Sequence, residues 1–92
     1  VEAVIFPTTP LPARPLREEM SEVQLGGENV PTFPTYIRNT DPGSNAGIPG
    51  ISVPAGASSE GLPIGIELDG PAGSDRRLLA IAAAVEAALA AQ

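Results

Sequence analysis

Two adjacent serines, Ser58 and Ser59, are the residues whose type first suggests covalent chemistry in this chain. A serine hydroxyl attacks a carbonyl only when a neighbouring base accepts its proton. The chain contains no His, no Lys and no Cys, so it offers neither a basic partner nor a thiol nucleophile. We therefore interpret Ser58 and Ser59, which lie between Gly56 and Gly61, as turn residues joining two strands.

The segment 39–45 reads Asn-Thr-Asp-Pro-Gly-Ser-Asn and could be taken for a metal loop. Closely spaced oxygen ligands suit Ca²⁺, but the spacing and the terminal glutamate of an EF-hand are missing. Asn and Asp beside Pro and Gly are typical of turns. We predict a turn and no metal site, with Thr40 and Asn45 bonding the backbone amides of the loop itself.

The acidic residues Glu18, Glu19 and Glu22 could act as general acids only if the fold held them together. Nothing in their spacing does so, and charges at helical spacing usually mark an exposed face. We expect a solvated face, with a helical turn over about 16–25 as one conformation that its thin apolar stripe allows.

Strands must position these polar segments. Residues 1–6, 50–54 and 63–69 have strand length, and the last two runs contain apolar residues at period two: Ile51, Val53, Ile64 and Ile66. We predict that these two runs form an antiparallel hairpin. The first run is apolar almost throughout, which is typical of a strand buried on both faces; a strand that begins at Ala3 fits the run as well.

A helix is predicted over about 74–91. Ser74 is a good N-cap, and apolar residues recur at helical spacing at Leu78, Ile81 or Ala82, Val85 and Leu89. Pro31 and Pro34 predict that a shorter helix begins near Pro34 or Thr35. The fold class predicted is therefore α/β, a mixed sheet flanked by helices.

The totals restrict the classes of partner. The formal net charge is −6 and no basic stripe occurs, which argues against nucleic acid. No apolar run approaches the ~20 residues of a membrane span, so no membrane partner is expected and a cytoplasmic location is the default. A homodimer stays open. Because Gly and Pro number 21 of 92 residues and only three strand runs are clear, we expect residues 1–92 to be one part of a domain rather than an independent one.

A family resemblance rests on two motifs. Residues 45–56 read N-A-G-I-P-G-I-S-V-P-A-G and residues 61–68 read G-L-P-I-G-I-E-L. They resemble the C-terminal portion of the amidase signature enzymes, which include mandelamide and indoleacetamide hydrolases. The resemblance extends from about Val4 to Leu89, nearly the whole chain, and would cover only the tail of a complete enzyme.

The resemblance implies hydrolysis of a carboxylic amide to an acid and ammonia, with an aryl-acetamide as the favoured class of substrate and an N-terminal catalytic part as partner. In this family a serine attacks the amide, and a second serine relays its proton to a lysine. With no Lys and no Gly-Ser-Ser signature here, no catalytic residue lies in this chain, and no cofactor is implied. The pocket wall that receives the small-molecule amide would involve these residues: Thr8, Thr9, Tyr36, Ile37, Asn39, Thr40, Asn45 and Ile48.

Simpler interpretations stand beside each of these assignments. Pro7–Pro12 is also a rigid exit from a strand, and Tyr36 is more often a core residue than a ligand contact. For the chain as a whole, the alternative is a non-catalytic binding or structural module that keeps an amidase-like scaffold. A third interpretation is a pseudoenzyme that has lost its catalytic residues.

Overall fold

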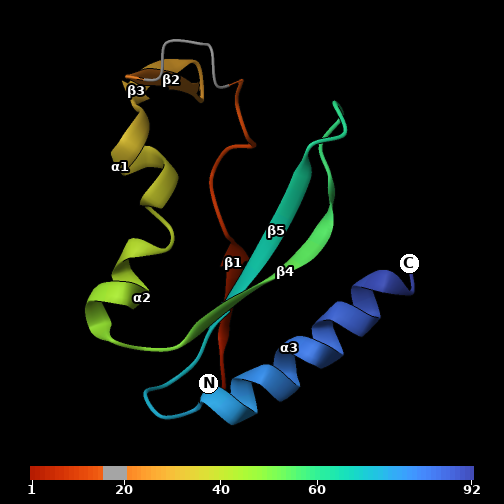
Figure 1. Ribbon diagram of the computed structural model, residues 1–92. Helices are drawn as coiled ribbons and strands as arrows, with labels where there is room; N and C mark the ends of the chain where they lie inside the picture. Colours follow the sequence, from red (N-terminus) through yellow and green to blue (C-terminus); the bar gives the residue numbers. More distant parts are fainter. Residues whose placement is uncertain (16–20) are drawn as a thin grey trace.

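The computed structural model describes residues 1–15 and 21–92, and Figure 1 shows the course of the chain. Its elements are, in order, β1 (Val4–Pro7), β2 (Glu22–Leu25), β3 (Glu28–Pro31), α1 (Thr32–Ile37), α2 (Asp41–Ala46), β4 (Gly50–Ala57), β5 (Pro63–Asp69) and α3 (Asp75–Ala90). The predicted α/β class is confirmed. The strand over 63–69 has the predicted bounds, whereas β1 begins three residues later than expected and β4 continues three residues further.

The main sheet has three strands in the order β1-β5-β4, and both pairs are antiparallel. The predicted hairpin is confirmed: Ile51 pairs with Leu68, and Val53 pairs with Ile66. A register shift between Pro54 and Gly56 marks a bulge, and Gly56 has φ +133°, which an L side chain rarely adopts.

Ser58 closes the β4–β5 turn, as the sequence predicted. Its hydroxyl oxygen accepts hydrogen bonds from the backbone N–H groups of Glu60 (3.3 Å) and Leu62 (3.1 Å). Its own N–H donates to the Leu62 carbonyl at 2.8 Å. The turn is therefore held by local bonds of the kind that serine readily forms.

Helix α3 covers one face of the sheet, mainly along β4, and runs diagonally beside the hairpin in Figure 1. The core between them consists of Val53, Leu68, Leu78 and Ala82, each at most 5% exposed. Ser74 occupies the predicted N-cap position, but its hydroxyl donates to the Pro71 carbonyl at 2.6 Å and makes no cap bond. The predicted capping role of the side chain is wrong, because the Ser74 hydroxyl accepts no bond from the first-turn amides of α3.

Three expectations for the middle of the chain are wrong. Residues 22–25 form a strand that pairs with β3, where part of a helical turn was expected; residues 16–20 of that expectation lie outside the described residues. Helix α1 begins at Thr32, before Pro34. Pro34 is its third residue, where a missing N–H costs nothing because the first-turn amides have no intrahelical acceptor.

Most of the predicted turn at 39–45 is a helix. Residues Asp41–Ala46 form α2, with Pro42 in the first turn and Gly47 closing it at φ +73°. Proline is accepted at this position, and a left-handed glycine commonly ends a helix. The Asp-Pro and Asn-Ala-Gly signals therefore mark the two ends of one short helix.

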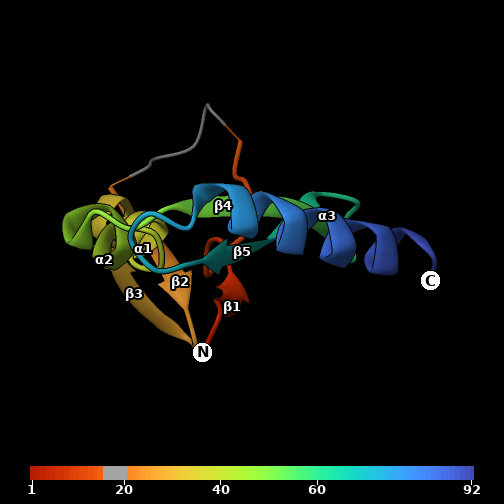
Figure 2. The same cartoon turned by 90° about the horizontal axis from the view of Figure 1, so that it is seen from below.

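The molecule is thin and open. It exposes 6368 Å², whereas a compact monomer of 9.3 kDa exposes about 5000 Å². Its radius of gyration is 14.7 Å, against about 12 Å for a compact chain of this length. Figure 2 shows α1 and α2 gathered at one end and the C-terminal end of α3 at the other. The expectation that the first strand is buried on both faces is wrong for this chain, because Val4 and Ile5 are 50% and 58% exposed.

Candidate functional site

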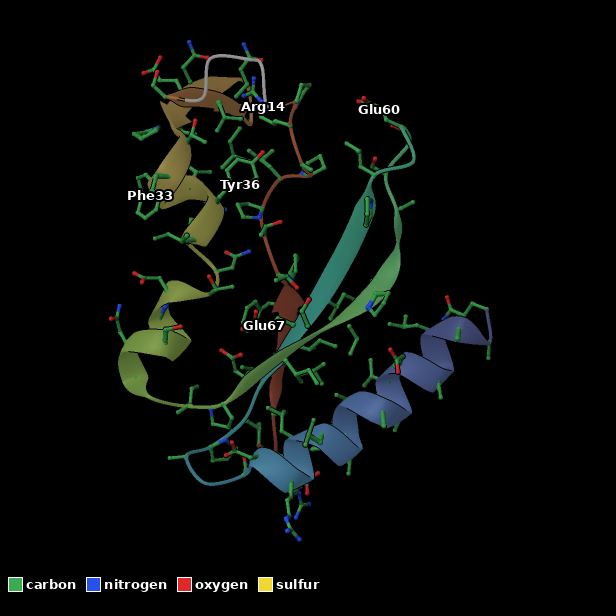
Figure 3. All side chains as sticks on the ribbon, viewed as in Figure 1. Arg14, Phe33, Tyr36, Glu60 and Glu67 are labelled. Atoms are coloured by element: carbon green, nitrogen blue, oxygen red, sulfur yellow. The ribbon has the colours of Figure 1, made fainter. Side chains whose placement is uncertain are left out.

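The face of the sheet opposite the apolar core carries two carboxyl groups, both on β5. Glu67 and Asp69 are two residues apart, so the alternation of the strand places them together while Leu68 joins the core. They are only 9% and 7% exposed. Figure 3 shows Glu67 where β1, β5 and β4 come together. Acidic side chains are seldom buried this deeply unless they are paired, which makes this face the chemically distinctive part of the molecule.

A cavity of about 230 Å³ opens beside these two side chains, and we call it the acidic cavity. Helix α2 and the segments beside it form one wall, and β4 and β5 form the other. Its lining consists of Thr40, Gly43, Ser44, Ile48, Gly50, Ile51, Ser52, Glu67 and Asp69.

Two glycines let these walls approach the carboxyl groups. A Cβ at Gly43 would lie 2.5 Å from Asp69 Oδ2, and a Cβ at Gly50 would lie 2.5 Å from Asp69 Oδ1 and 2.9 Å from Glu67 Oε2. These distances are shorter than non-bonded atoms tolerate, and a backbone that comes this close to another group typically needs glycine. The cavity therefore depends on glycine at both positions.

Burial and the charge of Asp69 both affect the pKa of Glu67. The pKa of Glu67 is raised from 4.5 to about 7, first by burial, then by its hydrogen bond to Asp69 and by the negative charge of that residue. Near neutral pH Glu67 therefore keeps its proton in part of the molecules, whereas an exposed glutamate would have lost it. Asp69 Oδ1 has no hydrogen-bond partner among the described residues. A buried acceptor left without a partner costs about 1–3 kcal/mol.

Thr8 extends this polar face toward β1. Its Oγ1 shares a hydrogen bond of 2.6 Å with Ser52 Oγ, and Ser52 lines the acidic cavity. The bond passes over Gly65 of β5, where a Cβ would lie 2.7 Å from Ser52 Oγ and 3.1 Å from Thr8 Oγ1. Glycine at this position thus lets hydroxyls from the two outer strands meet above the central one.

Some of the predicted binding residues around α2 lie at the acidic cavity, and others do not. Thr40 and Ile48 line it. Asn39 Nδ2 donates to the Pro7 carbonyl at 2.9 Å and so ties the start of this segment to β1. Asn45 is exposed on α2 and does not belong to the lining. The predicted bonding of Thr40 to loop amides is wrong, since its side chain makes no cap bond to α2; its hydroxyl donates to the Ile37 carbonyl at 3.2 Å.

The remaining predicted residues lie elsewhere. Tyr36 donates its hydroxyl to the Pro12 carbonyl at 2.7 Å and lines a broad cavity of about 810 Å³ together with Arg14 and Glu60. Ile37 lines a smaller hollow beside Tyr36 and Phe33. In Figure 3, Tyr36 and Arg14 lie well away from Glu67. Thr9 donates to the Leu11 carbonyl at 2.8 Å and borders a third cavity. The structure therefore distributes five of the eight predicted residues over four hollows: Thr9, Tyr36, Ile37, Thr40 and Ile48.

Sequence reasoning missed Glu67 and Asp69. The signal was present, because Ile64, Ile66 and Leu68 alternate with Gly65, Glu67 and Asp69 along one strand. That alternation assigns the two acids to one face, but an acidic face is normally interpreted as solvated. Only the position of α2 across this face reveals that they are buried.

The acidic cavity offers carboxyl and hydroxyl groups, which can hold a proton or accept hydrogen bonds from a ligand. Within residues 1–15 and 21–92, no group of three or more His, Cys, Asp or Glu side chains could hold a metal ion. Over the same ranges, none of the helices has the length and apolar character needed to span a membrane.

Comparisons with known proteins give a consistent result. The family model described as Amidase matches residues 1–79. An indoleacetamide hydrolase of Agrobacterium vitis is 51% identical over 89 residues, which is 97% of this chain and 19% of that protein. A mandelamide hydrolase of Pseudomonas putida is 48% identical over 97% of this chain and 16% of its own length. A fatty acid amide hydrolase of Medicago truncatula is 37% identical over 94% and 14%, respectively.

This chain thus spans less than a fifth of the length of these curated relatives. No solved structure gives a significant match. The agreement between the predicted motifs, the family model and relatives that align along nearly the whole sequence leads to one conclusion: the chain belongs to the amidase family.

Proposed function

We propose that this chain is the C-terminal part of a serine amidase that hydrolyses a carboxylic amide to an acid and ammonia. The observation that carries the proposal is the 51% identity, over 97% of the chain, with an indoleacetamide hydrolase. A mandelamide hydrolase follows at 48%, and both names denote aryl-substituted acetamides. The fatty acid amide hydrolase is lower, at 37%. This ranking favours an aryl-acetamide as the substrate class.

The proposed contribution of these residues is scaffold and pocket wall, with the reactive serine and its lysine on the N-terminal part. The chain has no Lys and no His, so it lacks the proton acceptor that an activated serine needs. Among the described strands, β1 and β4 are the edges of the sheet, each with one side unpaired. Free edges and the exposed apolar residues Val4, Ile5 and Phe33 are features that a larger body would cover. They support the view that residues 1–92 are not an independent domain.

We assign the substrate side of this wall to the predicted residues between β1 and β4. Thr8 belongs to the polar face, Asn39 joins the α2 segment to β1, and Thr40 and Ile48 line the acidic cavity. Thr9, Tyr36, Ile37 and Asn45 remain predictions for the outer part of the wall. Replacing Ile48 with Ala should raise KM for an aryl-acetamide more than it lowers kcat, because a wall residue binds substrate and transition state alike.

Complementation tests the proposal directly. The N-terminal part of the amidase would be mixed with this chain, and ammonia release from mandelamide and from indoleacetamide would be measured. We expect activity well above that of the N-terminal part alone. A chain carrying Leu68→Asp, which breaks the core between β5 and α3, is the matched control and should restore little. Equal activity with and without the chain would overturn the proposed role.

The second candidate is a binding or structural module without catalysis, and the formed acidic cavity in a chain without Lys or His favours it. Reading the coding sequence upstream of Val1 separates the two. A Gly/Ser-rich signature preceded by a Lys supports the amidase, and a degenerate signature supports the module or a pseudoenzyme. The cytoplasmic location and the homodimer stay predictions.

A further inference from the structure

The acidic cavity is rich in hydrogen-bond acceptors and poor in donors. Its lining contributes the carboxyl groups of Glu67 and Asp69 and the hydroxyls of Thr40, Ser44 and Ser52. The Thr40 hydroxyl proton is committed to the Ile37 carbonyl, so its oxygen faces a ligand as an acceptor. Among the described residues, no Arg side chain lines the cavity. The lining is therefore complementary to a group that carries donors and positive charge.

Asp69 supplies an independent observation. The residue is 7% exposed, it lines the cavity, and its Oδ1 has no hydrogen-bond partner in the described part of the chain. A hydrogen bond joins the carboxyl groups of Glu67 and Asp69. It leaves Asp69 Oδ1 without a donor among the described residues. Buried carboxyl oxygens normally accept a hydrogen bond. The cavity therefore contains an acceptor that still lacks its donor.

We propose that the acidic cavity binds a guanidinium group, which Glu67 and Asp69 receive on β5 while the hydroxyls opposite accept its remaining N–H groups. The site itself does not rest on the amidase proposal, since it concerns recognition of a cation and involves no amide chemistry; only the internal source of the cation, described below, rests on the larger amidase.

The chemistry of the lining favours a guanidinium over other occupants. A guanidinium carries five N–H donors in a planar fork that matches carboxylate oxygens, and it is more weakly hydrated than an ammonium group. The volume of about 230 Å³ is many times the ~10–15 Å³ needed for one water, so the cavity has room for a group of several atoms. A divalent metal is less suitable, because only two carboxyl groups are present and no described cluster of three acids exists.

The raised pKa of Glu67 supports the same conclusion. The pKa of Glu67 is raised to about 7 by burial and by Asp69, so in this chain a proton offsets part of the negative charge of the pair. A bound guanidinium would supply the charge that the proton now supplies and would satisfy more oxygens. The cation and the proton therefore compete for one site.

The guanidinium has two sources. It is either an Arg side chain from the part of the amidase outside these residues or a free small molecule that bears a guanidinium group. Both present the same chemistry to Asp69, and they are distinguished by whether the cavity is already filled in the complete protein.

The experiment uses the full-length amidase that contains this segment. Its crystal structure would be determined, and methylguanidinium would be titrated into it by calorimetry, with tetramethylammonium as a cation that has no N–H donors. Three variants accompany the wild type: Asp69→Asn removes a charge inside the cavity, and Gly50→Ala keeps both charges but places a methyl group against them. Asp41→Asn removes an equal charge from α2 outside the lining and is the control.

Two results support the inference. If the source is a free small molecule, methylguanidinium binds the wild type. Asp69→Asn and Gly50→Ala should each weaken this binding by about tenfold or more, because a charge-assisted hydrogen bond is worth about that factor. Asp41→Asn should change the affinity by less than about twofold. If the source is internal, methylguanidinium does not bind, and the crystal structure shows an Arg side chain within hydrogen-bond distance of Asp69.

Two results overturn it. One is a crystal structure in which only water, neutral amides or apolar groups meet Asp69, together with no binding of methylguanidinium. The other is binding that Asp41→Asn weakens as much as Asp69→Asn, or that tetramethylammonium reproduces, because either would indicate diffuse attraction to an acidic surface. The crystal structure of the wild type decides the internal case even if a variant fails to fold. None of these readouts depends on amide hydrolysis.

Discussion

The two faces of strand β5 bury side chains of opposite character: apolar groups on one face and two carboxyl groups on the other. On one face, Leu68 meets Leu78 and Ala82 of α3, and the contact needs no further group to complete it. On the other face, Glu67 and Asp69 are buried nearly as deeply, yet the pKa of Glu67 is raised and Asp69 Oδ1 has no partner among the described residues. The contact between Leu68 and α3 is complete within this chain, whereas the polar face keeps an acceptor that no described residue satisfies.

The difference indicates where stability and function lie. The hydrophobic effect is non-directional, so burial of Leu68 needs apolar surface on α3 but no single group at a defined position. Buried carboxyl groups need donors at defined positions, and a protein keeps such a demanding arrangement mainly where a ligand or another segment supplies those donors. We therefore assign the α3 face to the scaffold and the α2 face to recognition.

The largest effect should come from making the apolar face resemble the polar one. Leu68→Asp would place a carboxylate among apolar side chains with no partner, and we expect β5 to lose more than about 4 kcal/mol of protection. Amide hydrogen exchange of β5 in the full-length amidase measures this local unfolding free energy. Ile64→Asp, on the same face but 42% exposed in this chain, is the control and should cost clearly less than Leu68→Asp. Similar losses for the two variants would contradict the assignment.

The next effect concerns the pH dependence of the polar face. Because the pKa of Glu67 is about 7 in the folded chain and 4.5 ordinarily, the folded state binds more protons between these values. Stability from this group is therefore complete below about pH 4.5 and is lost as the pH rises through about 7. Glu67→Gln should match the wild type at low pH and exceed it above pH 7 by a few kcal/mol at most.

Carbon-detected NMR of the Glu67 carboxyl in the isolated chain measures its pKa directly. A value near the ordinary one would show that the acidic cavity does not form in the isolated chain. In the full-length protein, a guanidinium in the cavity should lower the pKa again, which would sharpen the contrast between the two faces.

A smaller effect is expected where hydroxyls bridge the polar face. Thr8→Ala and Ser52→Ala each remove one end of the 2.6 Å hydrogen bond over Gly65. A double-mutant cycle followed by hydrogen exchange of β1 should give a coupling of about 0.5–1.5 kcal/mol. Additive losses would mean that the two hydroxyls stabilise the sheet independently.

The smallest effect is expected at the ion pair between Arg77 and Glu2, whose side chains are 63% and 67% exposed. Solvent screens such a pair, so Arg77→Gln should cost less than about 0.5 kcal/mol. The neighbouring Arg76→Gln provides the comparison, and amide exchange of α3 reports both. A loss above about 1 kcal/mol for Arg77→Gln alone would show that this pair fixes the N-terminus to α3.

The sequence by itself determined the β4–β5 hairpin, α3 and the amidase family. Alternation in 63–69 and the three-to-four spacing from Leu78 to Leu89 are local patterns, and a local pattern fixes which side of an element is apolar. The same local logic failed at Thr32, where α1 begins two residues before Pro34, and at Asp41, where Pro and Gly were interpreted as turn residues although they mark helix ends.

Only the tertiary structure decided what covers each side. Whether Glu67 and Asp69 face water or a closed cavity depends on where α2 lies, and on glycines at positions 43 and 50 that allow its approach. Those residues are distant from β5 in sequence, and no periodicity within the strand encodes them. Burial, and with it the raised pKa and the unpartnered oxygen, is a property of contacts between segments, which the order of residues along one segment does not contain.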